Sequence, residues 1–357
     1  MKRIFIILAL CAGITITEAE NALTGQFTIN AGGDQVVFAK GNLQYQASSD
    51  SWRFAEHQYD FVGDDEYGTV YIGSTKCNGE KAKADYSGWI ELFPWGSSNW
   101  DNPNGVNGKE PWVRYSSQED HYAGGDANND LTGDYADADW AWHNAIEGDE
   151  AHTWRTMTYD EWNYVFTRND TTLCGQARIE IGYYNYVRGL VLLPDNWEEV
   201  KPEGLAFYVG ARLNYSKNKL TLEQWEQMAT AGAVFLPITG NRQSGVDFFV
   251  ANCEPSSAIG NYWTTTHKDE KDAWLFNFGD GQASKHPARM TAGHRYWGYA
   301  VRPVKAAAEA PTDVEMTDEQ IPVSRKQLRE GVILIEHNGR KYSVTGQKIE
   351  SLEGTQR

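Results

Sequence analysis

The chain has 357 residues, and its 49 Asp and Glu against 32 Lys and Arg give a formal net charge of −17 at pH 7. So negative a surface repels nucleic acids and anionic membranes, and it excludes both as expected partners. The 14 Trp, 19 Tyr and 13 Phe residues supply ample apolar surface for the core of one large domain, alone or with a small module.

Residues 1–19 predict a secretory signal peptide. Lys2 and Arg3 provide the positive start, an apolar run follows, and a small-residue cleavage site ends at Ala19. The apolar run is too short to span a bilayer, and no later segment reaches about 20 uninterrupted apolar residues, so no transmembrane segment is expected. Cys11 admits a lipid anchor, although Leu10 before it departs from the lipoprotein pattern. We expect an exported protein that is extracellular, on the outer-membrane surface or periplasmic.

Three cysteines follow the signal peptide: Cys77, Cys174 and Cys253. An odd number in an exported protein permits one disulfide plus one thiol, or no disulfide at all. The pattern does not decide between these alternatives. The count is too low for a disulfide-stabilised scaffold.

Short strands are predicted at the start of the large domain, at 25–30, 35–39, 42–46 and 52–54, and a meander of two hairpins is the simplest arrangement. Residues 63–155 differ in character, because they are rich in Gly, Asp, Asn and Trp and have almost no periodicity. Their tryptophans are spaced as if they anchor long loops to a core.

Two later segments begin in the same way, at Thr158–Trp162 and at Thr221–Trp225. In each, the Thr can cap a helix, the Glu or Gln three residues on can reach back to it, and the apolar residue before the Thr can pack on the Trp. Each predicted helix is followed by a buried strand that ends in Leu-Pro, at 190–194 and at 233–237. These signals predict two helices and two strands of the core.

The last third of the domain predicts three antiparallel strands, at 261–266, 273–278 and 299–303. A linker rich in Ala, Glu and Pro follows at 305–322. An Asn-Gly turn at 338–339 between two alternating runs then predicts a β-hairpin in the tail.

The predicted organisation is therefore a signal peptide (1–19), a large domain (20–304), a linker (305–322) and a small C-terminal β tail (323–357).

Six motifs of the large domain, taken together, resemble those of a known family. They are residues 130–140, 154–162, 189–197, 231–237, 260–265 and 300–304. In this order they resemble the exported proteins of the Fibrobacter succinogenes major-paralogous-domain type, which are widespread in Bacteroidetes. The resemblance covers roughly residues 24–304, and none of its motifs is catalytic. It implies an α+β, C-type-lectin-like fold, with two helices against a twisted, mostly antiparallel sheet and long inserted loops. The small C-terminal β-hairpin predicted from the Asn-Gly turn lies outside the resemblance.

The same fold also hosts the formylglycine-generating, sulfatase-modifying enzymes, which use a pair of reactive cysteines that coordinate copper. The last third of this chain contains only Cys253. Because this chain lacks the cysteine pair that those enzymes use, we do not assign their activity to it, and we expect no catalysis. The tail resembles the short C-terminal extension of many exported Bacteroidetes proteins and, more distantly, their type IX sorting tails.

A calcium site is the most concrete candidate for a metal. Asp126, Asn128 and Asp130 alternate along the chain, which directs oxygen ligands toward one centre, and Asp137 stands at the twelfth position of the loop. Leu131 replaces the glycine of the usual turn, and Asp137 replaces the bidentate Glu. A solvated acidic loop is the alternative. Calcium is the only cofactor that the sequence predicts.

Carbohydrate binding is what the resemblance to the lectin fold implies for an aromatic, acidic, exported domain, because sugars stack on exposed Trp while polar side chains bind their hydroxyls. The candidate ligand-binding residues are Trp95, Trp100, Trp112, Trp140, Trp142 and Trp297. The alternative for each is that it anchors a loop to the core. Core positions are expected for the tryptophans of the regular elements: Trp162, Trp225, Trp263 and Trp274. His143 with His152, and His286 with His294, are expected to have ordinary surface or loop roles.

The sequence thus predicts a non-catalytic binding or adhesion module for a glycan or a protein at the cell surface. Two alternatives stay open, which are an enzyme of the formylglycine-generating or hydrolase type and a structural component of the envelope.

Overall fold

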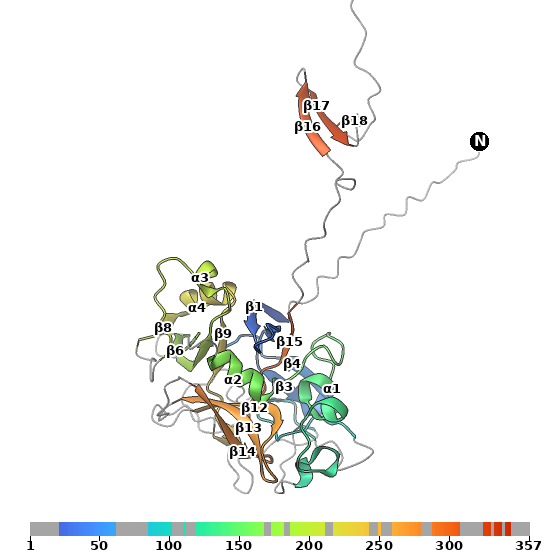
Figure 1. Cartoon of the computed structure of the whole chain (residues 1–357), viewed down its shortest axis with the longest axis vertical. Coiled ribbons are helices and arrows are strands. Elements are labelled where there is room, and N and C mark those ends of the chain that lie inside the picture. The colour runs from blue at the N-terminus through green and yellow to red at the C-terminus, as the bar shows by residue number, and fades with distance from the viewer. Residues whose placement is uncertain are drawn as a thin grey trace, which may run out of the picture. The chain divides into compact units, whose positions relative to one another are not determined.

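The computed structural model describes residues 21–61, 85–101, 110–111, 117, 119–167, 173–181, 186–210, 217–242, 249–250, 259–279, 288–307, 324–329, 332–337 and 340–343. The chain divides into two compact units, residues 1–307 and residues 308–357. The described part of the larger unit combines short helices with mostly antiparallel sheets, which confirms the predicted α+β class (Figure 1).

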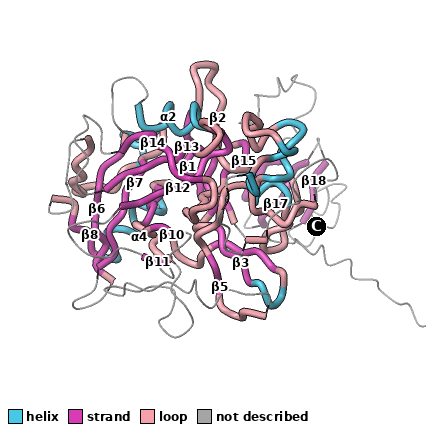
Figure 2. The backbone as a smooth tube through the Cα atoms, turned by 90° about the horizontal axis from the view of Figure 1, so that it is seen from below, coloured by secondary structure: helices cyan, strands magenta, loops and turns pink. Residues whose placement is uncertain are grey.

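The first and last strands of the larger unit lie in one sheet. Its order is β1 (Ala22–Thr28), β2 (Gln35–Ala39) and β15 (Val304–Ala306), all antiparallel (Figure 2). The first predicted hairpin is therefore confirmed. Lys305 and Ala306, which we expected in the linker, instead pair with β2.

The second predicted hairpin forms in a separate sheet, so the two hairpins are not one meander. Here β3 (Leu43–Gln46) lies between β4 (Ser51–Phe54) and β5 (Trp89–Ile90), and the 3-10 turn η1 (Ala47–Ser49) connects the first two.

Helix α2 (Tyr159–Thr167) begins where the sequence predicts. The backbone N–H of Glu161 donates to Thr158 Oγ1 at 3.3 Å, and the N–H of Thr158 donates to Glu161 Oε2 at 2.8 Å. Trp162 is fully buried and stacks on Phe276, with ring centroids 4.5 Å apart. The capping box therefore starts the helix, and the tryptophan joins it to the sheet below.

Helix α4 (Leu222–Thr230) repeats this design. The N–H of Gln224 donates to Thr221 Oγ1 at 3.2 Å, and the N–H of Thr221 donates to Gln224 Oε1 at 3.0 Å. Trp225 is buried and packs on Phe235, with centroids 5.4 Å apart.

The sheet beneath α4 has the order β8 (Lys219–Thr221), β6 (Cys174–Glu180), β7 (Tyr186–Leu192) and β9 (Val234–Pro237). Figure 2 labels the first three of these strands. Strands β7 and β9 are the two predicted Leu-Pro strands, and they pair antiparallel. Strand β8 runs parallel to β6. The short helix α3 (Trp197–Val200) follows β7.

Helix α2 packs on a sheet formed by β12 (Ile259–His267), β13 (Asp272–Gly279) and β14 (Ala288–His294) (Figure 1). The first two strands were predicted. The third was wrongly placed at 299–303, because β14 is built from small and polar residues that give little strand signal. Tyr299 and Ala300 make only isolated bridges, to Phe93 and Tyr262. A two-residue pair, β10 (Asn241–Arg242) and β11 (Phe249–Val250), lies in a further sheet.

The loop-rich region contains η2 (Glu119–His121), η3 (Ala123–Gly125), η4 (Gly133–Ala138) and α1 (Trp140–His143). Tryptophans anchor this region to the core. Trp95, Trp140 and Trp154 have at most 1% of their surface exposed and belong to one cluster of buried hydrophobic residues. The predicted anchoring of loops by tryptophan is confirmed for Trp95 and Trp140, and Trp154 adds an anchor that was not predicted.

A buried polar network joins the sheets around Arg302. Its guanidinium donates to Asn42 Oδ1 at 3.3 Å and to Gln58 Oε1 at 3.1 Å. Asn42 in turn donates to Glu91 Oε1 at 2.6 Å, and all four side chains are buried. Burial lowers the pKa of Arg302 to about 10, so the side chain is still charged at neutral pH.

The smaller unit contains three antiparallel strands in the order β16 (Ser324–Arg329), β17 (Val332–His337) and β18 (Arg340–Ser343). The hairpin predicted in the tail is confirmed as β17 and β18, and β16 adds a strand that was not predicted. None of the helices in the described ranges has the length and apolar character that crossing a membrane requires.

Candidate binding surface

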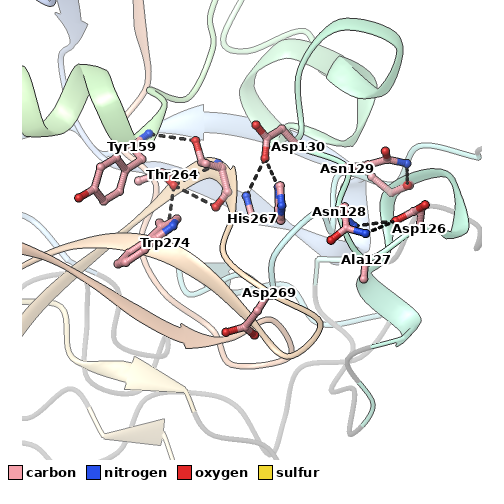
Figure 3. A network of polar contacts seen from close by, with 12 residues as sticks. Asp126, Ala127, Asn128, Asn129, Asp130, Tyr159, Thr264, His267, Asp269 and Trp274 are labelled. Atoms are coloured by element: carbon pink, nitrogen blue, oxygen red, sulfur yellow. Dashed lines mark hydrogen bonds and ion pairs between the residues drawn. The ribbon is translucent and has the colours of Figure 1, made fainter.

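Polar and aromatic side chains gather at one end of the β12–β13–β14 sheet. The turn between β12 and β13 carries Lys268, Asp269, Glu270 and Lys271, all exposed. The end of β14 and the segment from Tyr122 to Leu131 lie against this end of the sheet, as the contacts below show. Figure 3 shows part of this arrangement, with Asp130 and His267 facing each other between the acidic loop and the sheet.

A histidine–carboxylate contact fastens the acidic loop to β12. Asp130 Oδ1 accepts hydrogen bonds from the backbone N–H of His267 at 2.8 Å and from its Nδ1 at 2.5 Å (Figure 3). Next to it, the N–H of Leu131 donates to the carbonyl of Thr265 at 2.8 Å. These bonds fix the position of the loop relative to the end of the sheet.

Arg295 lies beneath this end and is fully buried. Its Nη2 donates to the carbonyls of Ala127 and, at 2.7 Å, Asp269, while its Cζ lies 4.7 Å from the Trp95 ring and 5.0 Å from the Tyr122 ring. Burial lowers the pKa of Arg295 to about 10, and the nearby acidic groups act against that shift. One buried cation therefore links the acidic loop to the turn between β12 and β13.

The surface of this end is formed by His294, Tyr296 and Trp297, which we name the aromatic corner. All three are half-buried. His294 Nδ1 lies 2.7 Å from Asp272 Oδ1, and its ring stacks with Tyr296 (centroids 5.4 Å apart) and meets Trp297 edge-on (4.7 Å). Asp272 therefore fixes the ring on which the corner is built.

Charged groups flank the aromatic corner. Lys268 Nζ lies 3.3 Å from Asp269 Oδ2 and 3.6 Å from Asp272 Oδ2. The pKa of Lys268 is raised, chiefly by its hydrogen bond with Asp269, and the pKa of Asp269 is lowered, chiefly by the backbone N–H of Lys271. The surface thus offers carboxylates and an ammonium group beside exposed ring atoms.

Trp274 extends the same surface toward α2. It is half-exposed and lies beside Tyr159, with the two ring centroids 4.7 Å apart (Figure 3). The Nζ atom of Lys268 lies 5.8 Å from the centroid of the Trp274 ring. We expected Trp274 in the core, so this position was wrong. The sequence held a signal, because Asp272 stands two residues earlier on the same face of β13.

Two of the predicted ligand-binding tryptophans are core residues. Trp95 and Trp140 have no exposed surface. The indole N–H of Trp95 donates to the carbonyl of Thr264 at 2.9 Å, and that of Trp140 donates to Ser97 Oγ at 3.0 Å. Neither ring has a face on which a sugar can stack, which corrects both assignments.

The other four predicted tryptophans have different positions. Trp297 belongs to the aromatic corner, Trp142 is half-buried beside His152, and Trp100 is half-buried against the core. Trp112 lies outside the described residues. Of the five predicted tryptophans that the structure describes, one therefore lies at the candidate surface. The corner residues His294 and Tyr296 were not predicted as ligand-binding.

The predicted calcium ligands have separate partners. Asp126 Oδ1 accepts from the N–H of Asn128 at 2.8 Å and from its side-chain amide at 3.1 Å, while Asp130 is bound to His267 (Figure 3). Asp137 lies beside two histidines. Within the described ranges, no group of three or more His, Cys, Asp or Glu side chains is placed to hold a metal ion. The calcium site therefore stays a prediction.

Several predictions lie outside the described residues: the signal peptide with Cys11, Cys77, Cys253 and His286. Cys174 is buried in β6. Comparison with known proteins gives no match, whether to a family model, to a curated protein or to a solved structure.

Proposed function

We propose that the chain is an exported, non-catalytic binding module, and that it binds a glycan at the aromatic corner. The observation that carries this proposal is the group formed by Asp272, His294, Tyr296 and Trp297, with Lys268 and Asp269 at its edge. Aromatic rings supply flat apolar faces, and charged oxygens and nitrogens supply strong hydrogen bonds to hydroxyl groups.

The corner is suited to binding because its parts are already oriented. Asp272 holds the Nδ1 side of His294, so the imidazole keeps one orientation and Nε2 is left for other contacts. Tyr296 and Trp297 both pack on this ring. Side chains that are ordered before a ligand arrives lose little conformational entropy when it binds.

The family and its fold remain part of this proposal. The ordered motifs of residues 130–304 are similar to the Fibrobacter succinogenes major-paralogous-domain type, and two capped helices beside antiparallel sheets with long loops are what a C-type-lectin-like fold requires. Export, and a location at the cell surface, rest on the signal peptide that the sequence predicts. A catalytic role is not proposed, because the last third of the chain holds a single cysteine.

A protein ligand is the second candidate, and a different surface favours it. Val200, Tyr208 and Val209 are the large hydrophobic side chains that stand exposed in the described part of the chain, at 38%, 52% and 44%. Buried Asn218 accepts from the N–H of Tyr208 at 2.9 Å and donates to its carbonyl at 2.8 Å. Tyr208 is therefore held in an exposed position, as an anchor for a protein partner would be.

A glycan array followed by titration calorimetry tests the first candidate. We expect selective glycan binding, and a dissociation constant about tenfold weaker in Tyr296→Ala and in Trp297→Ala, which corresponds to about 1.4 kcal/mol of binding free energy. Tyr208→Ala is the matched control, because it removes an exposed aromatic ring from the other surface and should leave the constant unchanged.

Loss of glycan binding in Tyr208→Ala but not in the corner variants would move the site away from the corner. A blank array, together with capture of a protein partner that Tyr208→Ala abolishes, would replace the first candidate by the second.

A further inference from the structure

One face of β13 passes from the core to the surface. Phe276 lies on this face, is fully buried and stacks on Trp162 of α2, with the ring centroids 4.5 Å apart. Because side chains alternate along a strand, Asp272 and Trp274 lie on the same face as Phe276. Tyr159, the first residue of α2, packs on Trp274, with the centroids 4.7 Å apart (Figure 3). The helix thus covers the face at Phe276, while Trp274 and Asp272 are partly exposed.

Strand β14 widens this face. Ala292 pairs with Trp274, and His294 pairs with Asp272. The side chain of Ala292 is a single methyl group, so it covers little of the Trp274 ring. Diagonal neighbours on paired strands lie about 7–8 Å apart, which places Trp274 next to His294. Because Tyr296 and Trp297 pack on the His294 ring, Trp274 and the aromatic corner share one surface.

Charged side chains fill the space between Trp274 and the aromatic corner. Lys268 Nζ lies 5.8 Å from the centroid of the Trp274 ring and 3.6 Å from Asp272 Oδ2. Asp272 Oδ1 lies 2.7 Å from His294 Nδ1, and the His294 ring meets Trp297 edge-on at 4.7 Å. The contacts therefore form a continuous row, with aromatic rings at both ends and charged groups in the middle.

We propose that Trp274, backed by Tyr159, is a second sugar subsite, and that an oligosaccharide spans this subsite and the aromatic corner, an inference that rests on the proposed function. A sugar ring has apolar C–H faces and polar edges, so a chain of rings suits aromatic faces separated by hydrogen-bonding groups. The row has this order. The step from Asp272 to Trp274 is about 7 Å along the strand, which is comparable with the length of one sugar unit.

The charges of this surface define the class of oligosaccharide. The charged side chains described here, all exposed or partly exposed, are Asp130, Asp269, Glu270, Asp272, Lys268 and Lys271. Lys268 is within ion-pair distance of both Asp269 and Asp272, so its charge is already matched. Arg295 beneath them adds one positive charge, which still leaves the carboxylates in excess. An acidic sugar would be repelled, and the oligosaccharide therefore carries no acidic groups.

A glycan array with neutral, uronic-acid and sulfated oligosaccharides of graded chain length tests both the span and the charge. We expect binding to a chain without acidic groups that is at least about tenfold tighter than binding to its own monosaccharide. Equal affinities for the monosaccharide and the longer chain would overturn the second subsite. Tighter binding of acidic chains than of neutral chains of the same length would overturn the charge assignment.

Titration calorimetry with the oligosaccharide selected on the array, and with its monosaccharide, locates the second subsite. Trp274→Ala should weaken binding of the oligosaccharide about tenfold and leave that of the monosaccharide unchanged, because only the longer chain reaches this ring. Trp274→Phe keeps a ring and should retain most of the affinity. Tyr208→Ala, which removes an exposed ring from the other surface, should leave both constants unchanged.

Circular dichroism establishes that each variant is folded. If Trp274→Ala is not, Trp274→Leu provides the same test, because it keeps an apolar side chain against Tyr159 but no ring.

The corner variants separate failure of this inference from failure of the proposed function. If Tyr296→Ala and Trp297→Ala weaken binding of the oligosaccharide but Trp274→Ala does not, the second subsite is overturned and the glycan site at the corner stands. If none of the three weakens it, or if the array is blank, both are overturned.

Discussion

Asp139 lies in an environment unlike that of an ordinary surface carboxylate. It is only 2% exposed and accepts hydrogen bonds from the N–H of Thr156 at 2.7 Å, from Thr156 Oγ1 at 2.6 Å and from the N–H of Ala141 at 3.2 Å. Desolvation dominates over these donors and raises its pKa from 3.8 to about 6. Asp139 thus begins α1 and connects it to the segment before α2.

The raised pKa predicts a pH dependence of stability. Because folding favours the protonated form, the contribution of Asp139 is fully present below pH 3.8 and is lost as the pH rises through about 6. The free energy of unfolding of Asp139→Asn, minus that of the wild type, should therefore increase by about 3 kcal/mol across this window. Urea denaturation at a series of pH values measures the difference, and parallel profiles of the two proteins would contradict the assignment.

At the residue scale, the sequence predicts which tryptophans lie in helices or strands better than it predicts which tryptophans are buried. Trp162 and Trp225 are buried as predicted, because a helix repeats its buried face at fixed intervals. Trp95 and Trp142 lie in segments without periodicity, so nothing in the local pattern revealed that one is buried and the other half-exposed. The pairing of Asp137 with two histidines was hidden for the same reason.

At the scale of elements, local chemistry decided what could be predicted. Helices α2 and α4 begin with capping boxes whose donors and acceptors lie three residues apart, so the sequence alone locates them. Strand β14 and helix α1 carry weaker local signals. They form because β13 and the loop tryptophans supply partners from distant parts of the chain.

The capping box of α4 provides a test at this scale. Thr221→Ala removes the acceptor for the N–H of Gln224 and should lower the free energy of unfolding by about 1 kcal/mol. Thr230→Ala is the control at the other end of the same helix. It removes only an exposed bond from Thr230 Oγ1 to the carbonyl of Glu226 and should change stability by less than about 0.5 kcal/mol. Equal effects of the two substitutions in chemical denaturation would argue against the box.

At the scale of the whole molecule, strand β15 sets the end of the larger unit. Val304 is fully buried and exchanges two backbone hydrogen bonds with Arg155, at 2.8 and 2.9 Å. The sequence placed the end of the domain at this residue, because the composition changes there. It could not show that Lys305 and Ala306 continue the strand, since a pairing with distant β2 leaves no local pattern.

Two truncations test this boundary. A chain that ends after Ala307 keeps β15 and should retain the thermal midpoint of the larger unit. A chain that ends after Pro303 lacks the buried Val304 and the pairing with β2, and it should lose at least about 2 kcal/mol of stability. Calorimetry of both chains measures the difference, and equal midpoints would show that β15 is dispensable.

The sheet β1–β2–β15 also has a consequence for the order of folding. Synthesis proceeds from the N-terminus, so β1 and β2 emerge first and β15 emerges last of all the strands of the larger unit. The far edge of β2 therefore has no β15 to pair with until nearly the whole unit has left the ribosome. The first sheet of the larger unit is therefore completed only after β15 has been synthesised.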